Sequence, residues 1–434
     1  MTNTPHNLCE LDKRHFWHPF TQMREWTAPD HDPLVIASGE GAILRDLEGR
    51  EYLDGNSSIW TNIHGHNHPA INRAIVEQLE RIAHCSALGS TNEPAILLAA
   101  RLTGLFPPGT LSRCFFSDDG STAMECAMKM AIQYWQLRGC PERREFFAFS
   151  QAYHGDTLGA ASLGAIPSFH SRFAGLGVKT HHLRDLSELS GLDASATRNV
   201  AAVVIEPLVQ GAAGIRLWPE GTLRELRRWC DRHGVLLLCD EVMTGFGRTG
   251  TMFACEQEGV VPDMIALAKG LTGGYLPLAA TLVTEEIYHT FLGEVEEGRA
   301  FSHGHSYCGN ALGCAAALAS LALFERENTL SRLAPRIEHL RRILGNLARE
   351  NAWVSECRQI GFIAGIDVVA ADGQPFPRTE QRGHRICLAA RRHGLLTRPV
   401  GDTLVLMPPL CTTEAQLDSA LEAIDRAILE VCSP

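Results

Sequence analysis

The sequence predicts an α/β protein, with a large domain built on a mostly parallel sheet and a smaller α/β domain. Short runs that are apolar at every residue alternate with helical patterns through the middle of the chain. Such runs suit strands covered on both faces, and their alternation with helices implies right-handed crossovers between parallel strands. A chain of 434 residues is also too long for one ordinary domain, which predicts a second one.

Strands and helices can be assigned along the chain from these patterns. The predicted strands of the large sheet are residues 113–117, 146–149, 200–205, 235–239 and 264–268. Amphipathic helices are expected at 121–137 and 221–233. Beyond residue 310 the pattern predicts helices at 311–325, 330–352 and 413–431, with strands at 361–369 and 404–407. We expect residues 1–60 to join the small domain, 61–325 to form the large domain and 326–434 to form the small domain.

The composition limits the classes of partner. The chain is 45% hydrophobic and 21% charged, with a net charge of −11. An acidic surface disfavours nucleic acid and anionic membranes, because phosphate groups need a basic footprint. The 14 cysteines are scattered without a C-x-x-C pair, which is typical of buried free thiols in a reducing compartment. With no apolar signal segment or membrane-spanning stretch in the sequence, we expect a cytoplasmic protein.

Chemically informative residues follow the predicted strands. Glu206, Asp240 and Lys269 each come directly after a strand of the large sheet. A turn of small residues, Asp119-Gly120-Ser121-Thr122, lies between the first strand and its helix. Ligands in this architecture bind at the carboxyl ends of parallel strands. We therefore expect two acids, a lysine and this turn to meet at one edge of the sheet.

These residue types suit pyridoxal 5′-phosphate (PLP) chemistry. Lys269 follows an apolar run that can desolvate its amine, so that it can carry the cofactor as a Schiff base and move a proton on the substrate. Asp240 can keep the pyridine nitrogen protonated. The backbone N–H groups of Gly120 and Ser121, at the start of a helix, can bind the phosphate.

Other interpretations of single motifs are weaker. A lysine at a strand end is usually a solvated charge, and Asp-Gly-Ser-Thr is an ordinary turn, so only the joint pattern favours a cofactor site. Residues 245–250 match G-x-G-x-x-G but do not open the first βαβ unit of a dinucleotide-binding fold. The histidines of 64–68 lack the spacing of zinc ligands, and we expect no metal. Residues 153–156 lack a hydrolase nucleophile elbow.

Residues 236–280 carry a resemblance to a known family. They contain LLLCDEVMTGFGRTGTMFACE and PDMIALAKGLTGGYLPLAA, which resemble the signature of class III aminotransferases of PLP fold type I. Further motifs resemble the branch of this family that forms 7,8-diaminononanoate in biotin biosynthesis, namely HFWHPFTQM, LDGNSSIWTNIHGHNHP, EPLVQGAAG and LLTRPVGD. The resemblance covers nearly the whole chain. It implies transamination of small-molecule substrates by a homodimer whose active site is shared between subunits.

The resemblance implies a role for each matching residue. The catalytic residues would be Lys269, Asp240 and Tyr153, with the tyrosine stacked on the cofactor ring. The cofactor-binding residues would be Asp119, Gly120, Ser121, Tyr153, Glu206, Asp240, Lys269, His305 and Ser306. The substrate-binding residues would be Phe20, Ile59, Trp60, Lys269, Gly304 and Arg398. Arg398 would grip a substrate carboxylate, Gln210 would join Glu206 in the floor of the site, and 304–306 would complete the neighbouring subunit's site.

Two positions bear on the amino donor. The best-known members of the branch use S-adenosylmethionine and have Tyr and Trp where this chain has Phe20 and Ile59. An indole face suits a sulfonium cation, and members that use lysine look similar to this chain at both positions. The resemblance implies transfer to 8-amino-7-oxononanoate, with S-adenosylmethionine as donor and L-lysine as the alternative. The other hypotheses are an ω-amino-acid or diamine aminotransferase, a non-catalytic PLP-fold binding protein, and a dinucleotide-dependent oxidoreductase.

Overall fold

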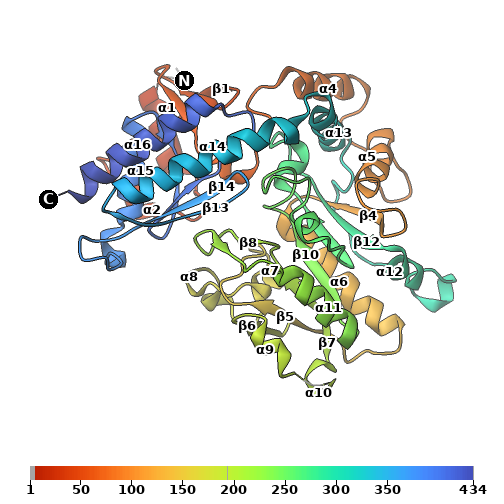
Figure 1. Cartoon of the computed structure of the whole chain (residues 1–434). Helices are drawn as coiled ribbons and strands as arrows, with labels where there is room; N and C mark the ends of the chain where they lie inside the picture. Colours follow the sequence, from red (N-terminus) through yellow and green to blue (C-terminus); the bar gives the residue numbers. More distant parts are fainter. Residues whose placement is uncertain (1–4, 193, 434) are drawn as a thin grey trace.

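The computed structural model describes residues 5–192 and 194–433, and a seven-stranded sheet lies at its centre (Figure 1). In spatial order its strands are β4 (Leu111–Ser117), β12 (Ala279–Thr284), β11 (Met264–Leu267), β10 (Leu236–Asp240), β7 (Val200–Ile205), β5 (Glu145–Phe149) and β6 (Thr180–Leu183). The pairs β11–β10, β10–β7, β7–β5 and β5–β6 are parallel, as the apolar runs predict. Only β12 is antiparallel to its neighbours β11 and β4.

Both faces of this sheet are covered. Leu236 and Leu238 of β10 join a core with α6 (Gly120–Leu137) and α7 (Leu158–Leu163). The alternate residues Leu237 and Cys239 join a second core with α11 (Thr222–His233), α5 (Glu93–Thr103) and α13 (Ala311–Arg326). Because strand side chains alternate between faces, two covered faces require the continuous apolar runs of the sequence.

The two ends of the chain form a second unit. One sheet has the order β1 (Ile36–Glu40), β2 (Ile43–Asp46), β3 (Glu51–Asp54), β15 (Leu395–Leu396), and its β3–β15 pair is parallel. The other has the order β13 (Val354–Ile360), β14 (Ile363–Val368), β17 (Thr403–Leu406), β16 (Pro399–Val400). The helices α14 (Thr329–Glu350), α15 (Arg382–Arg392) and α16 (Glu414–Cys432) lie beside them (Figure 1). The boundaries at residues 60 and 325 stay a prediction.

Shorter elements complete the chain. The remaining helical segments are α1 (Pro5–His15), α2 (Met23–Trp26), α3 (Ser57–Trp60), α4 (Pro69–Arg81), α8 (Pro167–His170), α9 (Ser187–Ser190), α10 (Ala194–Thr197) and α12 (Glu285–Thr290). Of these, α3 is a single turn with left-handed backbone angles. Single 3₁₀ turns are η1 (Ser171–Phe173), η2 (Ala254–Glu258), η3 (Lys269–Thr272), η4 (Val295–Glu297) and η5 (Arg378–Glu380), and a small hairpin pairs β8 (Val209–Gln210) with β9 (Arg216–Leu217). Within the described ranges, no helix is long and apolar enough to cross a membrane.

Candidate active site

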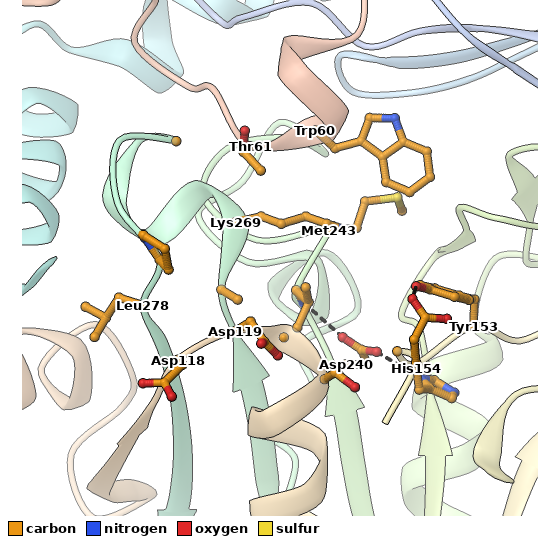
Figure 2. A pocket seen from close by; sticks show the side chains of 18 of the residues that line it. Trp60, Thr61, Asp118, Asp119, Tyr153, His154, Asp240, Met243, Lys269 and Leu278 are labelled. Atoms are coloured by element: carbon orange, nitrogen blue, oxygen red, sulfur yellow. Dashed lines mark hydrogen bonds and ion pairs between the residues drawn. The ribbon is translucent and has the colours of Figure 1, made fainter. Parts of the chain in front are cut away.

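A cavity of about 740 Å³ lies at the carboxyl ends of the parallel strands (Figure 2). Its lining brings together Glu206 after β7, Asp240 at the end of β10 and Lys269 after β11. The N-terminal end of α6 lines it as well. The structure therefore gathers the predicted acids, lysine and small-residue turn at one edge of the sheet. Its size suits a cofactor together with a small substrate.

Lys269 extends across this cavity beneath Trp60 (Figure 2). Its Nζ lies 4.8 Å from the centre of the Trp60 ring, and no carboxylate lies within ion-pair distance of it in the described part of the chain. Burial lowers the pKa of this amine below its ordinary value of 10.5, while Asp240 and Glu206 act in the opposite direction. A lowered pKa increases the fraction of neutral amine, which is the nucleophilic form.

Asp240 is held at the end of β10 by two hydrogen bonds. Its Oδ1 accepts the backbone N–H of Val242 at 3.0 Å, and its Oδ2 pairs with His154 Nδ1 at 2.7 Å. Because a carboxylate only accepts, the proton of this bond lies on Nδ1. The other ring nitrogen of His154 is buried and has no hydrogen-bond partner among the described residues. The carboxylate is therefore fixed in orientation but keeps lone pairs for a ligand.

Glu206 forms the floor of the cavity. Its Oε1 accepts the backbone N–H of Tyr153 at 3.2 Å, and its Oε2 accepts that of Gly211 at 3.0 Å. The side chain is only 7% exposed. Burial, reinforced by the charge of Asp240, raises its pKa to about 7. This carboxyl group therefore changes protonation near neutral pH beside Lys269.

The start of α6 offers free N–H groups to the cavity. Asp119 is the N-cap, and its carboxylate accepts the N–H of Thr122 at 2.9 Å while the Thr122 hydroxyl accepts that of Asp119. Among the described residues, the N–H groups of Gly120 and Ser121 find no partner, as expected for the first turn of a helix. A side chain at Gly120 would lie 2.6 Å from Val242, so only glycine allows this close approach. The helix end can bind an anion.

The aromatic side chains of the site are oriented by polar partners. Tyr153 donates its hydroxyl hydrogen to Asp156 at 2.6 Å, and burial followed by Asp156 raises its pKa. Trp60 donates its indole N–H to Asn56 Oδ1 at 2.7 Å. Phe20 is exposed, and its ring meets that of Phe169, which in turn meets Tyr153 edge to face. A row of aromatic rings thus leads from Phe20 to the cavity.

Several predicted residues do not line the cavity of this single chain. They are Phe20, Ile59, Gln210, Gly304, His305, Ser306 and Arg398. Gln210 is buried and donates to the carbonyl of Ser150 at 3.0 Å. His305 lies 3.2 Å from the carboxylate of Asp118, which does line the cavity. The exposed Arg398 side chain has no hydrogen bond or ion pair within residues 5–192 and 194–433.

The motifs set aside in the sequence have structural partners. His64 bonds to Ser320 at 3.1 Å, and burial lowers its pKa to about 3, while His66 bonds to Asp54 at 2.9 Å. No group of three or more metal-ligating side chains occurs among the described residues. Glu241, next to Asp240, accepts the backbone N–H groups of Ala254 and Cys255 at 2.8 Å and so holds η2.

Sequence reasoning missed the role of His154. The motif YHGD at 153–156 marks a histidine after β5, a strand that is separated from β10 by β7 alone in the sheet. That placement brings its ring to Asp240 (Figure 2). A histidine following a strand of the same sheet was therefore the available signal.

The residues present fit PLP. A buried amine with a lowered pKa, an oriented carboxylate and free N–H groups at a helix end face one cavity, and these are the partners of its aldehyde, ring nitrogen and phosphate. The family model described as Aminotransferase class-III matches residues 26–428. The chain belongs to the class III aminotransferases. Its activity is therefore PLP-dependent transamination, and its fold is that of fold type I.

Relatives in this family are similar over nearly their whole length. Proteins named adenosylmethionine-8-amino-7-oxononanoate aminotransferase include one from Nitratidesulfovibrio vulgaris, 50% identical over 98% of this chain and 82% of the relative. The one from Geobacter sulfurreducens is 46% identical over 97% of both chains. The crystal structure of the enzyme of that name from Methanocaldococcus jannaschii matches with a TM-score of 0.95 and 40% identity, over 99% of this chain and 100% of that one.

Proposed function

We propose that this class III aminotransferase converts 8-amino-7-oxononanoate to 7,8-diaminononanoate in biotin biosynthesis, with S-adenosylmethionine as amino donor. The observation that carries the proposal is the juxtaposition of Lys269, Asp240 and the α6 N-terminus in one cavity. Eight relatives at 33–50% identity bear the name of this reaction. The free cysteines fit a reducing compartment, and we propose the cytoplasm as its location.

The proposal gives each residue a task. When bound, PLP supplies an electron-accepting ring that stabilises the charge left as the substrate Cα–H bond breaks. Lys269 Nζ would accept that proton and later donate it again, and the lowering of its pKa by burial favours the neutral form that can accept it. Asp240, oriented by His154, holds a proton on the ring nitrogen. Gly120 and Ser121 bind the phosphate, and Tyr153 covers the ring.

An exposed arginine supports a carboxylate substrate. Arg398 lies between β15 and β16 with its guanidinium exposed, and its planar fork matches a carboxylate. The 8-amino-7-oxononanoate molecule carries such a group. A crystal structure of an (S)-enantioselective ω-transaminase from Thermomicrobium roseum is also similar, with a TM-score of 0.91 and 34% identity over 99% of this chain and 100% of that one. An ω-transaminase with a different substrate is therefore the second candidate.

We also propose a homodimer with shared sites. The exposed Gly304 and Ser306 lie outside this chain's own cavity, although they match substrate and cofactor positions. Apolar side chains are exposed along α4, α5 and the neighbouring loops, namely Val76, Leu79, Leu88, Ile96, Leu97 and Tyr307. A surface of this kind favours a symmetric interface.

One assay tests the reaction and the donor. The purified enzyme receives 8-amino-7-oxononanoate with either S-adenosylmethionine or L-lysine, and the diamine product is followed. Formation of the diamine with S-adenosylmethionine supports the proposal. If the diamine forms only with L-lysine, lysine is the amino donor, as Phe20 and Ile59 would favour. Absence of product with both, together with turnover of other amines, would support the ω-transaminase. Bound PLP without any turnover would revive the non-catalytic hypothesis.

The shared site has its own test. Lys269→Ala and Ser306→Trp variants are each purified and then mixed under conditions that allow subunit exchange. If each site uses one subunit's lysine and its partner's loop, a mixed dimer contains one intact site. Activity should return to about a quarter of the wild-type level in an equal mixture, since half of the dimers are mixed and each has one good site. No recovery despite demonstrated exchange would contradict shared sites.

A further inference from the structure

The turn Ser57–Trp60, at the edge of the cavity, has an unusual backbone. The φ angles of Ser57, Ser58, Ile59 and Trp60 are 46°, 49°, 65° and 69°, so four successive L-residues adopt the left-handed conformation. This conformation brings each Cβ close to the following carbonyl oxygen, and it is worst for a β-branched residue such as Ile59. Such strain persists only where surrounding contacts determine the backbone.

A buried carboxylate supplies several of those contacts. Asp54 Oδ1 accepts the backbone N–H groups of Asn56 and Ser58, both at 3.2 Å. Its Oδ2 accepts the Ser58 hydroxyl at 3.1 Å and the His66 Nε2–H at 2.9 Å. Asn62 Nδ2 lies 3.2 Å from His66 Nδ1 and fixes the histidine tautomer. The hydrogen bonds donated by the two backbone N–H groups, the Ser58 hydroxyl and His66 therefore all end on the carboxylate of Asp54. This residue is only 3% exposed.

The turn is also tied to both neighbouring parts of the site. Ser57 donates its hydroxyl hydrogen to the carbonyl of Met407 at 2.6 Å, just after β17. On the other side, Trp60 places its ring over Lys269 Nζ and lines the cavity. Ile59 precedes it and is 43% exposed. A right-handed turn of the same residues would direct both side chains elsewhere, because handedness sets the direction of each Cβ.

We propose that Asp54 and His66 are positioning residues that hold this left-handed turn and thereby select substrates through Trp60 and Ile59. Neither residue lines the cavity, and both act through the backbone of the turn. The inference rests on the proposed function, since it concerns the substrates of the same site. It gives His66, in the histidine motif at 64–68, a structural role instead of metal binding.

The first test compares two buried aspartates of one sheet. Asp54→Asn and His66→Gln are assayed for kcat and KM with each amino donor and with the amino acceptor. Asp46→Asn is the control, because Asp46 is also 3% exposed and accepts hydrogen bonds from Arg50 and Tyr52, and none of these three residues lines the cavity. We expect KM for a substrate to rise about tenfold in the two variants, because each variant weakens one charge-assisted hydrogen bond and a tenfold change is the size of that loss. We expect kcat to change less than about threefold. The control should leave KM unchanged.

The second test isolates the backbone. In Ile59→Gly the strain at this position disappears, because glycine adopts positive φ freely. Asp54→Asn should then raise KM by clearly less in the Ile59→Gly background than alone, because the turn no longer needs the carboxylate to hold a strained residue. Coupling of this kind is what a double-mutant cycle measures. Fully additive effects would overturn the role of the strained turn.

The outcomes separate this inference from the proposed function. Labelling of Lys269 by PLP and borohydride should be equal in wild type, Asp54→Asn and His66→Gln, since none of these changes touches the lysine. An active wild-type enzyme whose Asp54→Asn and Asp46→Asn variants show the same KM would overturn the inference alone. A wild-type enzyme that labels at Lys269 yet transfers no amino group would overturn the proposed function and the inference with it.

Discussion

Replacing Glu206 by glutamine should change how the stability of the protein depends on pH. The pKa of this carboxyl group is about 7 in the folded chain, because burial and the nearby Asp240 disfavour its charge, against an ordinary value of 4.5. The folded state therefore binds the proton more tightly than the unfolded state. Where that holds, the free energy of unfolding falls as pH rises, and the loss is complete above the folded pKa.

The magnitude follows from the two pKa values. Between about pH 5 and pH 8, ionisation of this one group should remove roughly 2–3 kcal/mol from the free energy of unfolding of the wild type. Glu206→Gln has the same shape and no charge to lose, so its stability relative to wild type should improve by that amount over the same interval. The lost acceptor for one backbone N–H adds a constant offset at every pH.

Urea unfolding of the cofactor-free protein, followed by circular dichroism across this pH range, measures the difference. Glu220→Gln is the control, since Glu220 is exposed in a loop and its removal should leave the pH dependence unchanged. Titrating groups that do not interact with Glu206 are common to the pair, so they cancel in the comparison. Stability curves for wild type and Glu206→Gln that run parallel from about pH 5 to pH 8 would refute the reasoning.

Three further predictions concern the chemistry. Lys269→Ala should abolish transamination but leave a folded protein that still binds PLP noncovalently, as equilibrium dialysis would measure; near-normal turnover would exclude the lysine from its role. The pH midpoint for borohydride trapping of PLP on Lys269 should lie below the ordinary amine value of 10.5, because burial lowers the pKa of this amine; a midpoint at or above 10.5 would contradict that assignment. Ile59→Trp should raise kcat/KM for S-adenosylmethionine relative to lysine, since an indole face attracts a sulfonium; an unchanged ratio would exclude Ile59 from donor choice.

The large domain was predictable because its signals are local. A strand covered on both faces must be apolar at every residue, so the predicted strands at 200–205 and 264–268 agree with β7 and β11 within one residue. The positions of Glu206, Asp240 and Lys269 followed from one rule about strand ends. Helices with strong periodicity, such as α16, were placed within a residue of their observed bounds.

Elements that depend on distant partners were not predictable in the same way. The strand β12 is apolar like its neighbours, and no local signal shows that its chain direction is reversed. The strands β1, β2 and β3 alternate little and depend on pairing with β15, more than 300 residues away in the sequence. The left-handed turn at Ser57–Trp60 contains no glycine, so propensity rules predict against it.

The buried Arg248 explains why the two chain ends belong to the active site. Its guanidinium is fully buried, and it donates to the carbonyl of Asn62 and to that of Pro408, both at 2.5 Å. These partners come from the segment after the strained turn and from the segment after β17, so one side chain joins both ends to the loop that follows Asp240. Burial lowers its pKa to about 9, and its charge also lowers that of Lys269. A buried cation without its two carbonyl partners would be costly, so docking of both chain ends and the reactivity of the lysine depend on the same side chain.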